Sequence, residues 1–247
     1  MNTLLRLLLF LYASQVYAAD IPANLQWAGR VEIGPRVSGI VKTVHAKVGE
    51  HVKRGHILLV LDNQIYQART SGAAAVVARR ELEVADAKLN LARIQELYDR
   101  TVSSTSELDE AKLKLGRAES ALKEARAELA IQSKNVSDSL VRAPFDAIVV
   151  ARLAELGQNV VVSMNPQPVF VLARSNEMLA RANLPAAQTK GLKIGQPLSV
   201  IIDNKSYNGK LANIVYEPGN KDSMTIDVQF PTTEIFPAGM PATVRLP

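Results

Sequence analysis

The longest regular pattern of apolar and polar positions covers residues 63 to 138, which are rich in Ala, Leu, Glu, Lys and Arg. Apolar residues recur there at alternating spacings of three and four, which is typical of coiled-coil helices. We therefore predict two helices that pack through two seams. The first seam consists of Ala75, Ala78, Leu82, Ala85, Leu89 and Ala92, and the second of Leu108, Ala111, Leu115, Ala118, Leu122, Ala125 and Leu129.

Only a short polar break, residues 100–106, separates these two helices. Two long helices joined by so short a loop must run antiparallel. Each has roughly 35 residues and is about 50 Å long at 1.5 Å per residue. We predict a helical hairpin over residues 63–140, which has no globular core of its own and is suited to be a spacer or a lever.

Short apolar runs of the β type lie on both sides of the hairpin and form an internal repeat. Ile40, Gly49 and Val52 recur as Ile148, Gly157 and Val160, all at an offset of 108 residues. Neither half can close a core alone, so the halves must bury one set of side chains against the other. The first set is Val37, Ile40, Val52, Ile57 and Leu59, and the second is Phe145, Ile148, Val160, Val169 and Val171.

Glycines punctuate these runs, and we assign turn positions to Gly39, Gly49, Gly55 and Gly157. Gly49 and Gly157 are expected to have positive φ in tight turns. Residues 21–29, before the first run, are interpreted as an entry segment to this β domain. The β domain is predicted to comprise residues 19–62 and 141–174.

Residues 175–247 form a third unit of β runs with Gly and Pro between them. We predict strands at 179–184, 198–202, 207–215, 224–230 and 242–246, a turn at Asn208-Gly209, and a small closed β-barrel. The predicted fold class is thus α+β, elongated and multidomain.

In this order the motifs resemble those of periplasmic adaptor subunits, also called membrane fusion proteins, of tripartite efflux pumps and type I secretion systems. Residues 36–62 and 141–157 resemble the two halves of that family's lipoyl-like, or barrel-sandwich hybrid, domain, and residues 194–197 and 237–240 resemble turns of its barrel. The resemblance implies an adaptor between an inner-membrane transporter (an RND permease or an ABC transporter) and a TolC-like outer-membrane channel. It also implies a homo-oligomer, a ring of six. The chain ends directly after the predicted barrel, so the family's membrane-proximal domain is expected to be absent.

Adaptors that dock onto TolC-like channels carry Arg, Leu and Ser at a fixed spacing at the hairpin tip, and Arg93, Leu97 and Ser104 match this spacing. The resemblance therefore implies that these three residues dock onto the channel. Ser104 also forms a capping-box pattern with Glu107, which predicts the start of the second helix. Leu97 lies off the predicted seam and is expected to be exposed. Leu91 and Leu113 also lie off both seams and are expected to contact neighbouring hairpins.

The amino terminus predicts export. A short apolar segment follows Arg6, and small residues at Val16 and Ala18 favour cleavage before Ala19, so residues 1–18 are predicted to be a signal peptide. The segment is too short to span a bilayer. We expect a periplasmic protein held at the inner membrane through its transporter.

Composition excludes several classes of function. The 247 residues include no Cys, which excludes disulfides and Cys-based metal sites. The net charge of +5 is interspersed and aromatic residues are only 5%, so we expect no nucleic-acid partner. The turn that carries the modified Lys in lipoyl and biotinyl carriers is replaced by the hairpin, so no cofactor is expected.

No catalytic motif is found, so we predict a protein that is not an enzyme. His45, His51 and His56 cluster in one half-repeat, but we interpret them as solvated side chains and predict no metal site. Three alternatives stay open: an adaptor of an ABC-type secretion or macrolide-type export system, a periplasmic substrate-binding or chaperone-like protein without a channel, and an enzyme's carrier domain.

Overall fold

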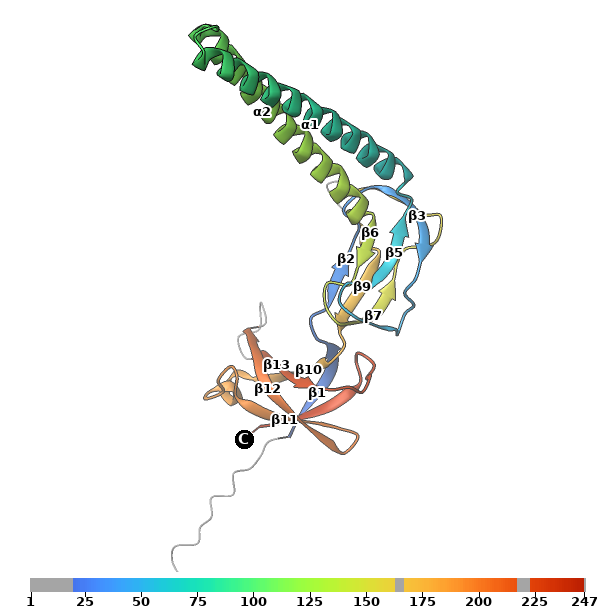
Figure 1. Cartoon of the computed structure of the whole chain (residues 1–247). Coiled ribbons are helices and arrows are strands. Elements are labelled where there is room, and N and C mark those ends of the chain that lie inside the picture. The colour runs from blue at the N-terminus through green and yellow to red at the C-terminus, as the bar shows by residue number, and fades with distance from the viewer. Residues whose placement is uncertain (1–19, 163–166, 217–222, 247) are drawn as a thin grey trace, which may run out of the picture. The chain divides into compact units, whose positions relative to one another are not determined.

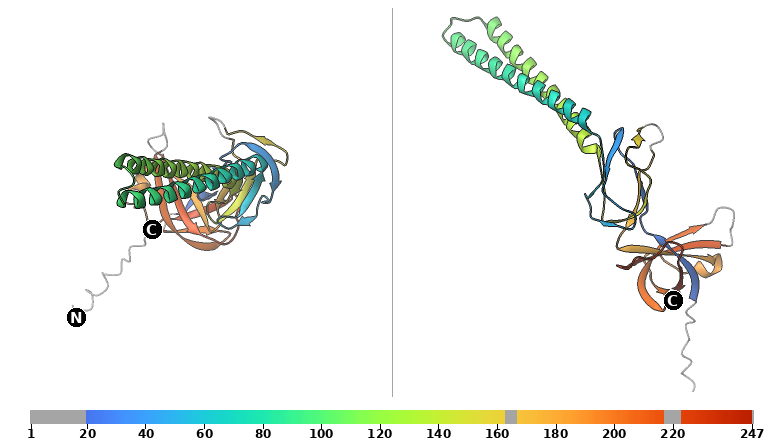
Figure 2. Two further views of the ribbon diagram at one scale, coloured as in Figure 1. Left: turned by 45° about the horizontal axis from the view of Figure 1, so that its top comes forward. Right: turned by 90° about the vertical axis from the view of Figure 1, so that its right-hand side faces the viewer.

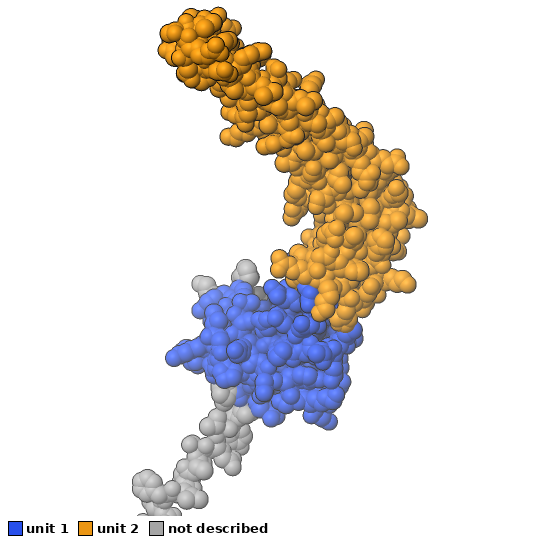
Figure 3. All heavy atoms as spheres, in the orientation of Figure 1, with its two compact units in different colours: residues 1–31, 146–148, 173–247 blue, residues 32–145, 149–172 orange. Residues whose placement is uncertain are grey.

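The computed structural model describes residues 20–162, 167–216 and 223–246. The chain divides into two compact units, which Figure 3 shows in two colours. One comprises residues 1–31, 146–148 and 173–247, and the other residues 32–145 and 149–172. The predicted signal peptide, residues 1–18, lies outside the described residues.

The first unit contains a closed barrel of antiparallel strands in the order β1-β10-β13-β12-β11-β14. Alternate side chains of each strand point inward, and the largest that are fully buried include Leu25, Leu184, Leu211 and Phe230. Closure leaves these strands without a free edge. The bounds are β1 Asp20–Trp27, β10 Glu177–Pro185, β11 Pro197–Ile202, β12 Lys205–Tyr216, β13 Ser223–Pro231 and β14 Pro241–Arg245, with a short 3-10 helix at Ala186–Thr189.

Strand β1 corrects one predicted boundary. We expected the segment before residue 30 to lead into the lipoyl-like domain, but it completes the barrel by pairing with both β10 and β14. Ile21, Ala23 and Leu25 are buried in the barrel core, and Asp20 forms a bidentate ion pair with Arg245, with Nε–Oδ1 at 2.7 Å. The alternation of apolar and polar residues in this segment was the sequence signal for a strand.

The turn predicted at Asn208-Gly209 is also wrong, because both residues lie inside β12. Strands β11 and β12 are instead joined by Asp203 and Asn204, which have φ values of 46° and 63°. Positive φ at both central residues is the signature of a type I′ hairpin turn. The Gly of Asn208-Gly209 has a packing role, since a Cβ there would lie 2.7 Å from Cγ1 of Val228 and 3.0 Å from the carbonyl oxygen of Gln229.

We expect Gly209→Ala to destabilise the barrel by about 1–3 kcal/mol, as overpacking of a closed core does. Thermal unfolding followed by the fluorescence of Trp27, the only tryptophan, measures this. Gly191→Ala is the control, since its left-handed φ of 98° strains any side chain but no described atom lies within 4 Å of its Cβ position. If Gly209→Ala unfolds no earlier than wild type, the close approach of β13 is not what requires glycine.

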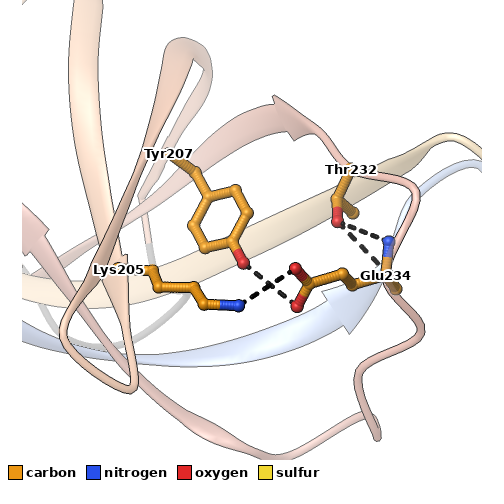
Figure 4. A network of polar contacts seen from close by, with 4 residues as sticks. All are labelled: Lys205, Tyr207, Thr232 and Glu234. Carbon is orange, nitrogen blue, oxygen red and sulfur yellow. Dashed lines mark hydrogen bonds and ion pairs between the residues drawn. The ribbon is translucent and has the colours of Figure 1, made fainter.

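A small polar network fastens the segment after β13 to β12 (Figure 4). The Glu234 carboxylate accepts hydrogen bonds from Lys205 Nζ and from the Tyr207 hydroxyl, both at 3.3 Å. The Tyr207 ring packs on Phe230 and Phe236, with ring centroids 5.5 and 5.9 Å away. The backbone N–H of Glu234 donates to Thr232 Oγ1 at 3.0 Å. The segment is therefore held by both polar and aromatic contacts.

The second β structure is a sandwich of two four-stranded sheets, ordered β2-β9-β7-β4 and β6-β5-β3-β8. Each sheet takes two strands from either side of the hairpin, so neither half of the chain completes a sheet alone. This confirms the predicted barrel-sandwich hybrid, although Ile40, which we expected in the core, is exposed. The bounds are β2 Val31–Ile33, β3 Gly39–Val44, β4 His51–Val52, β5 Ile57–Leu61, β6 Leu140–Arg142, β7 Ala147–Arg152, β8 Asn159–Val160 and β9 Phe170–Arg174.

Hydrogen bonds between the halves repeat the sequence offset. Gly49 N–H donates to the Val149 carbonyl at 2.8 Å, and Gly157 N–H donates to the Val41 carbonyl at 2.9 Å. Gly49, Gly55 and Gly157 have φ values of 80–84°, which glycine adopts readily. Gly39 differs: its φ is not positive, and a Cβ there would lie 3.3 Å from Cβ of Leu61. It therefore allows close packing.

The helical hairpin consists of α1 Gln64–Asp99 and α2 Thr105–Asp138, which run side by side in Figures 1 and 2. Its base is tied to the sandwich, since the N–H of Leu61, at the end of β5, donates to the carbonyl of Ser139, directly after α2, at 2.9 Å. The Tyr66 hydroxyl donates to the Ser38 carbonyl at 2.7 Å. The hairpin thus grows out of the junction between the two half-repeats.

Candidate functional site: the hairpin and its tip

The contact between the two helices confirms the predicted seam of α2 and contradicts that of α1. On α2, Leu108 is buried, as are Ala111 and Ala125, and Leu115, Leu122 and Leu129 are half-buried. On α1, Leu82 and Leu89 are 72% and 73% exposed, so they do not face α2. The residues of α1 that do are Ala73, Val77, Arg80, Val84, Ala87, Leu91 and Ile94.

The seam of α1 was predicted wrongly because α1 carries two apolar series with the same heptad spacing. The series that faces α2 includes Val84 and Ala87, which are 7% and 1% exposed. Spacing alone cannot choose between two such series, and the leucine content favoured the wrong one. Leu91, which we expected to contact neighbouring hairpins, belongs to the seam inside the chain and is half-buried.

Ion pairs between the helices show which residues lie at the same level. Arg126 Nη2 lies 2.7 Å from Glu81 Oε1, and Lys88 Nζ lies 3.6 Å from Glu119 Oε1. From the first ion pair to the second, the residue number rises by seven on α1 and falls by seven on α2. This is expected for antiparallel helices that share one heptad repeat. These exposed pairs add little stability, but they define the register.

The tip is a tight turn that follows directly from the end of α1. The N–H of Val102 donates to the Leu97 carbonyl, and the N–H of Thr101 donates to the Tyr98 carbonyl, both at 2.8 Å. These two bonds form a Schellman motif. Its left-handed residue is Thr101, with φ of 58°, where glycine is usual. A β-branched residue in this conformation is strained, and such strain concentrates at functional sites.

Ser104 begins α2 through the predicted capping box. The N–H of Glu107 donates to Ser104 Oγ at 3.2 Å, and the N–H of Ser104 donates to Glu107 Oε2 at 2.8 Å. Ser103 Oγ donates to the same carboxylate oxygen at 2.7 Å. The backbone hydrogen bond from Ser104, followed by those from the two hydroxyls, lowers the pKa of Glu107 below its usual 4.5.

We expect the start of α2 to loosen in acid. A carboxylate whose pKa is lowered by folding stabilises the folded form above 4.5, the pKa of the unfolded chain, and this contribution is lost as the pH falls through the folded pKa. Amide hydrogen exchange at Ser104 and Glu107 should therefore speed up below about pH 4.5, beyond the intrinsic pH dependence. Glu107→Gln keeps an acceptor oxygen without a titrating proton, and it should remove this extra acceleration. An unchanged pH profile in the variant would show that another group is responsible.

The three residues of the docking motif lie around this tip turn. Arg93 is exposed and donates from Nη2 to Asn90 Oδ1 at 2.8 Å. Leu97, four residues later, shares its helix face. It is half-buried, not exposed as we predicted, because the prediction relied on the wrong register of α1. Beside them, Val102 is exposed at the turn, so apolar surface is present at the tip.

Possible metal-binding and membrane-spanning segments were sought among the residues that the structure describes. These residues include no group of three or more His, Cys, Asp or Glu side chains that could hold a metal ion, and His45, His51 and His56 are all exposed. Of the described helices, none is both long enough and apolar enough to span a membrane.

Comparisons with known proteins agree on one family. Residues 29–173 match the model of the CzcB-like barrel-sandwich hybrid domain, which is more than half of the chain. Macrolide export protein MacA of Yersinia pestis is 28% identical over 83% of this chain and 61% of its own length. Cobalt-zinc-cadmium resistance protein CzcB of Cupriavidus metallidurans is 27% identical over 74% of this chain and 36% of its own length. The chain therefore spans less than two thirds of the length of either relative.

Among solved structures, MacA from Actinobacillus actinomycetemcomitans superposes with a TM-score of 0.67. The alignment covers 92% of this chain and 78% of that structure at 19% identity, which supports the same fold and no more.

Proposed function

Because the chain belongs to the family with the CzcB-like barrel-sandwich hybrid domain, we propose that it is a periplasmic adaptor of an efflux pump. It links an inner-membrane transporter to a TolC-like outer-membrane channel, and the tip of its hairpin docks onto the channel. Copies of the chain assemble into a homo-oligomeric ring, six protomers by family resemblance. The role is to bind and to space its partners, without catalysis.

The structure of the hairpin tip is the main support for this proposal. A hairpin about 50 Å long ends in apolar and cationic side chains, and both helices are capped so tightly that the turn has little freedom. Arg93 and Leu97 present a charge and an apolar surface on one face. A partner made of helices can accept both, by an ion pair and by packing. Export by a signal peptide, residues 1–18, brings the chain to the periplasm.

The experiment compares two exposed or half-exposed apolar residues of the hairpin. In a pull-down, affinity-tagged Leu97→Ser protein should no longer capture the TolC-like channel encoded in the same genome. The variant should also abolish export, while its melting temperature changes little. Ile131→Ser, at a 55% exposed position near the hairpin base, is the matched control and should retain both activities. If Leu97→Ser captures the channel as well as wild type does, the docking role of the tip is refuted.

The relatives point to two substrate classes, since one is named for macrolides and another for cobalt, zinc and cadmium. A deletion strain challenged with macrolides and with these three metals separates the two classes by which tolerance it loses. Sequence similarity is near equal to both relatives and does not favour either. A periplasmic binding or chaperone-like role without a channel predicts that no tolerance is lost when the tip is changed.

A further inference from the structure

The exposed apolar series of α1 has no partner among the described residues, although it has the spacing of a helix-packing seam. We call Ala75, Ala78, Leu82, Ala85, Leu89 and Ala92 the outer stripe. Its two leucines are more than 70% exposed. Apolar residues at alternating spacings of three and four line up on one helix face, and alanines between leucines let another backbone approach closely. The outer stripe is thus suited to a second helix.

The outward face of α2 carries a matching series of small residues. Leu113, Gly116, Ser120, Ala127 and Ala130 follow the same spacing, interrupted by Lys123, and all are exposed. Leu113 is 61% exposed, and Gly116 and Ser120 line a shallow groove beside it. Glycine is unfavourable inside a helix, yet apart from its chain neighbours and the nearby backbone of α2 no described atom lies within 4 Å of the Cβ position of Gly116. Packing within the chain therefore gives no reason for this glycine, whereas the approach of another helix does.

We propose that the outer stripe of α1 packs antiparallel against this face of α2 in a second copy of the chain, with Leu89 at the level of Leu113. Two charged residues beside the stripe then face two of opposite charge on α2, Arg79 with Glu124 and Asp86 with Arg117. Asp86 also lies 3.6 Å from Lys114 of its own chain, so its carboxylate would lie between two cations.

Charge along this edge of the contact also favours this register. A slip of one heptad in one direction places Arg79 opposite Arg117 and Asp86 opposite Glu110. A slip in the other direction places Asp86 opposite Glu124 and Arg93 opposite Arg117. Each slip brings two pairs of like charges together, whereas the proposed register pairs opposite charges along this edge and leaves only Lys123 as a cation near Arg79.

The two faces differ, so each copy keeps one free face after pairing and the contact can repeat from copy to copy; it gives a ring when the rotation between copies closes, as the proposed ring of adaptors requires. The inference thus rests on the proposed ring of adaptors and assigns the residues that join neighbouring hairpins. The Leu113 prediction made from the sequence agrees with this assignment, whereas Leu91 has no part in it.

Disulfide cross-linking tests the register, because the chain has no cysteine of its own. Ala85→Cys with Gly116→Cys places two thiols that face each other between copies. The two positions point outward from different helices, so a cross-link must join two chains. Oxidation of the full-length protein should give a ladder of dimers, trimers and larger species. Ala78→Cys with Gly116→Cys is the matched control, because Ala78 lies seven residues, or about 10 Å, along the helix from Ala85. This control should give at most traces of cross-linked species.

A ladder that is no stronger for Ala85→Cys with Gly116→Cys than for its control would overturn the proposed contact. Arg79→Glu in the cross-linking pair should weaken the ladder several-fold, and adding Glu124→Arg should restore it. Failure of this restoration would equally refute the register. Capture of the channel by the same protein preparations is measured as a separate assay. Protein that captures the channel but forms no cross-linked ladder refutes only this contact between copies. Protein that forms the ladder but does not capture the channel refutes only the proposed docking.

Discussion

Val84→Asp should unfold the hairpin while Leu82→Asp should leave it intact, although leucine is the larger side chain. Val84 faces α2 and is 7% exposed, so its replacement buries an unpaired carboxylate, which costs about 3–5 kcal/mol. Leu82 lies on the outer stripe, where an aspartate stays in water. A hairpin that depends on one narrow seam has few other contacts to offset such a loss.

Far-UV circular dichroism at 222 nm measures this effect, because the described residues outside the hairpin contain only one four-residue 3-10 helix. The fluorescence of Trp27 reports on the barrel independently, since this residue lies in β1 and packs on the barrel core. We expect Val84→Asp to lose most of the helical signal with the Trp27 transition unchanged. Dilute protein is used, so that self-association through the outer stripe does not contribute. The reverse ranking of the two variants would restore the seam predicted from the sequence.

The two apolar series of α1 also illustrate which features of the fold could be predicted from the sequence and which could not. The split β repeat, the hairpin and the barrel follow from local patterns, because turn residues and periodicity are properties of each segment. The choice between the two apolar series of α1 depends on which face meets α2, which is a property of the pair. Strand β1 was missed for a similar reason, since its pairing partners lie more than 150 residues later in the chain.

At the hairpin tip, one local feature could be predicted from the sequence and two others could not. The capping box of Ser104 and Glu107 was readable, because it joins residues three apart and needs no distant partner. The Schellman turn was not, because its left-handed position is occupied by Thr101 and not by glycine. The half-burial of Leu97 was missed through the same error of register that misplaced Leu82.

Shortening both helices by one heptad should abolish export while leaving the hairpin folded. Deleting residues 75–81 and 126–132 together removes Glu81 and its partner Arg126, and the remaining residues keep the same level and the same heptad phase. The hairpin becomes about 10 Å shorter. Its tip, Leu82 and Leu89 are retained. We expect a helical signal per residue close to that of wild type and normal capture of the isolated channel.

Export tests the spacer role separately from docking, because a rigid spacer of the wrong length can bind one partner but cannot bridge two. We expect no restoration of tolerance in the deletion strain. Deleting residues 75–81 alone is the control for matching: it leaves Arg126 without its partner and one heptad of α2 unpaired, and should lower the melting temperature of the hairpin. If the doubly shortened protein restores full tolerance, the length of the hairpin does not set the distance between transporter and channel, and its function lies in the tip alone.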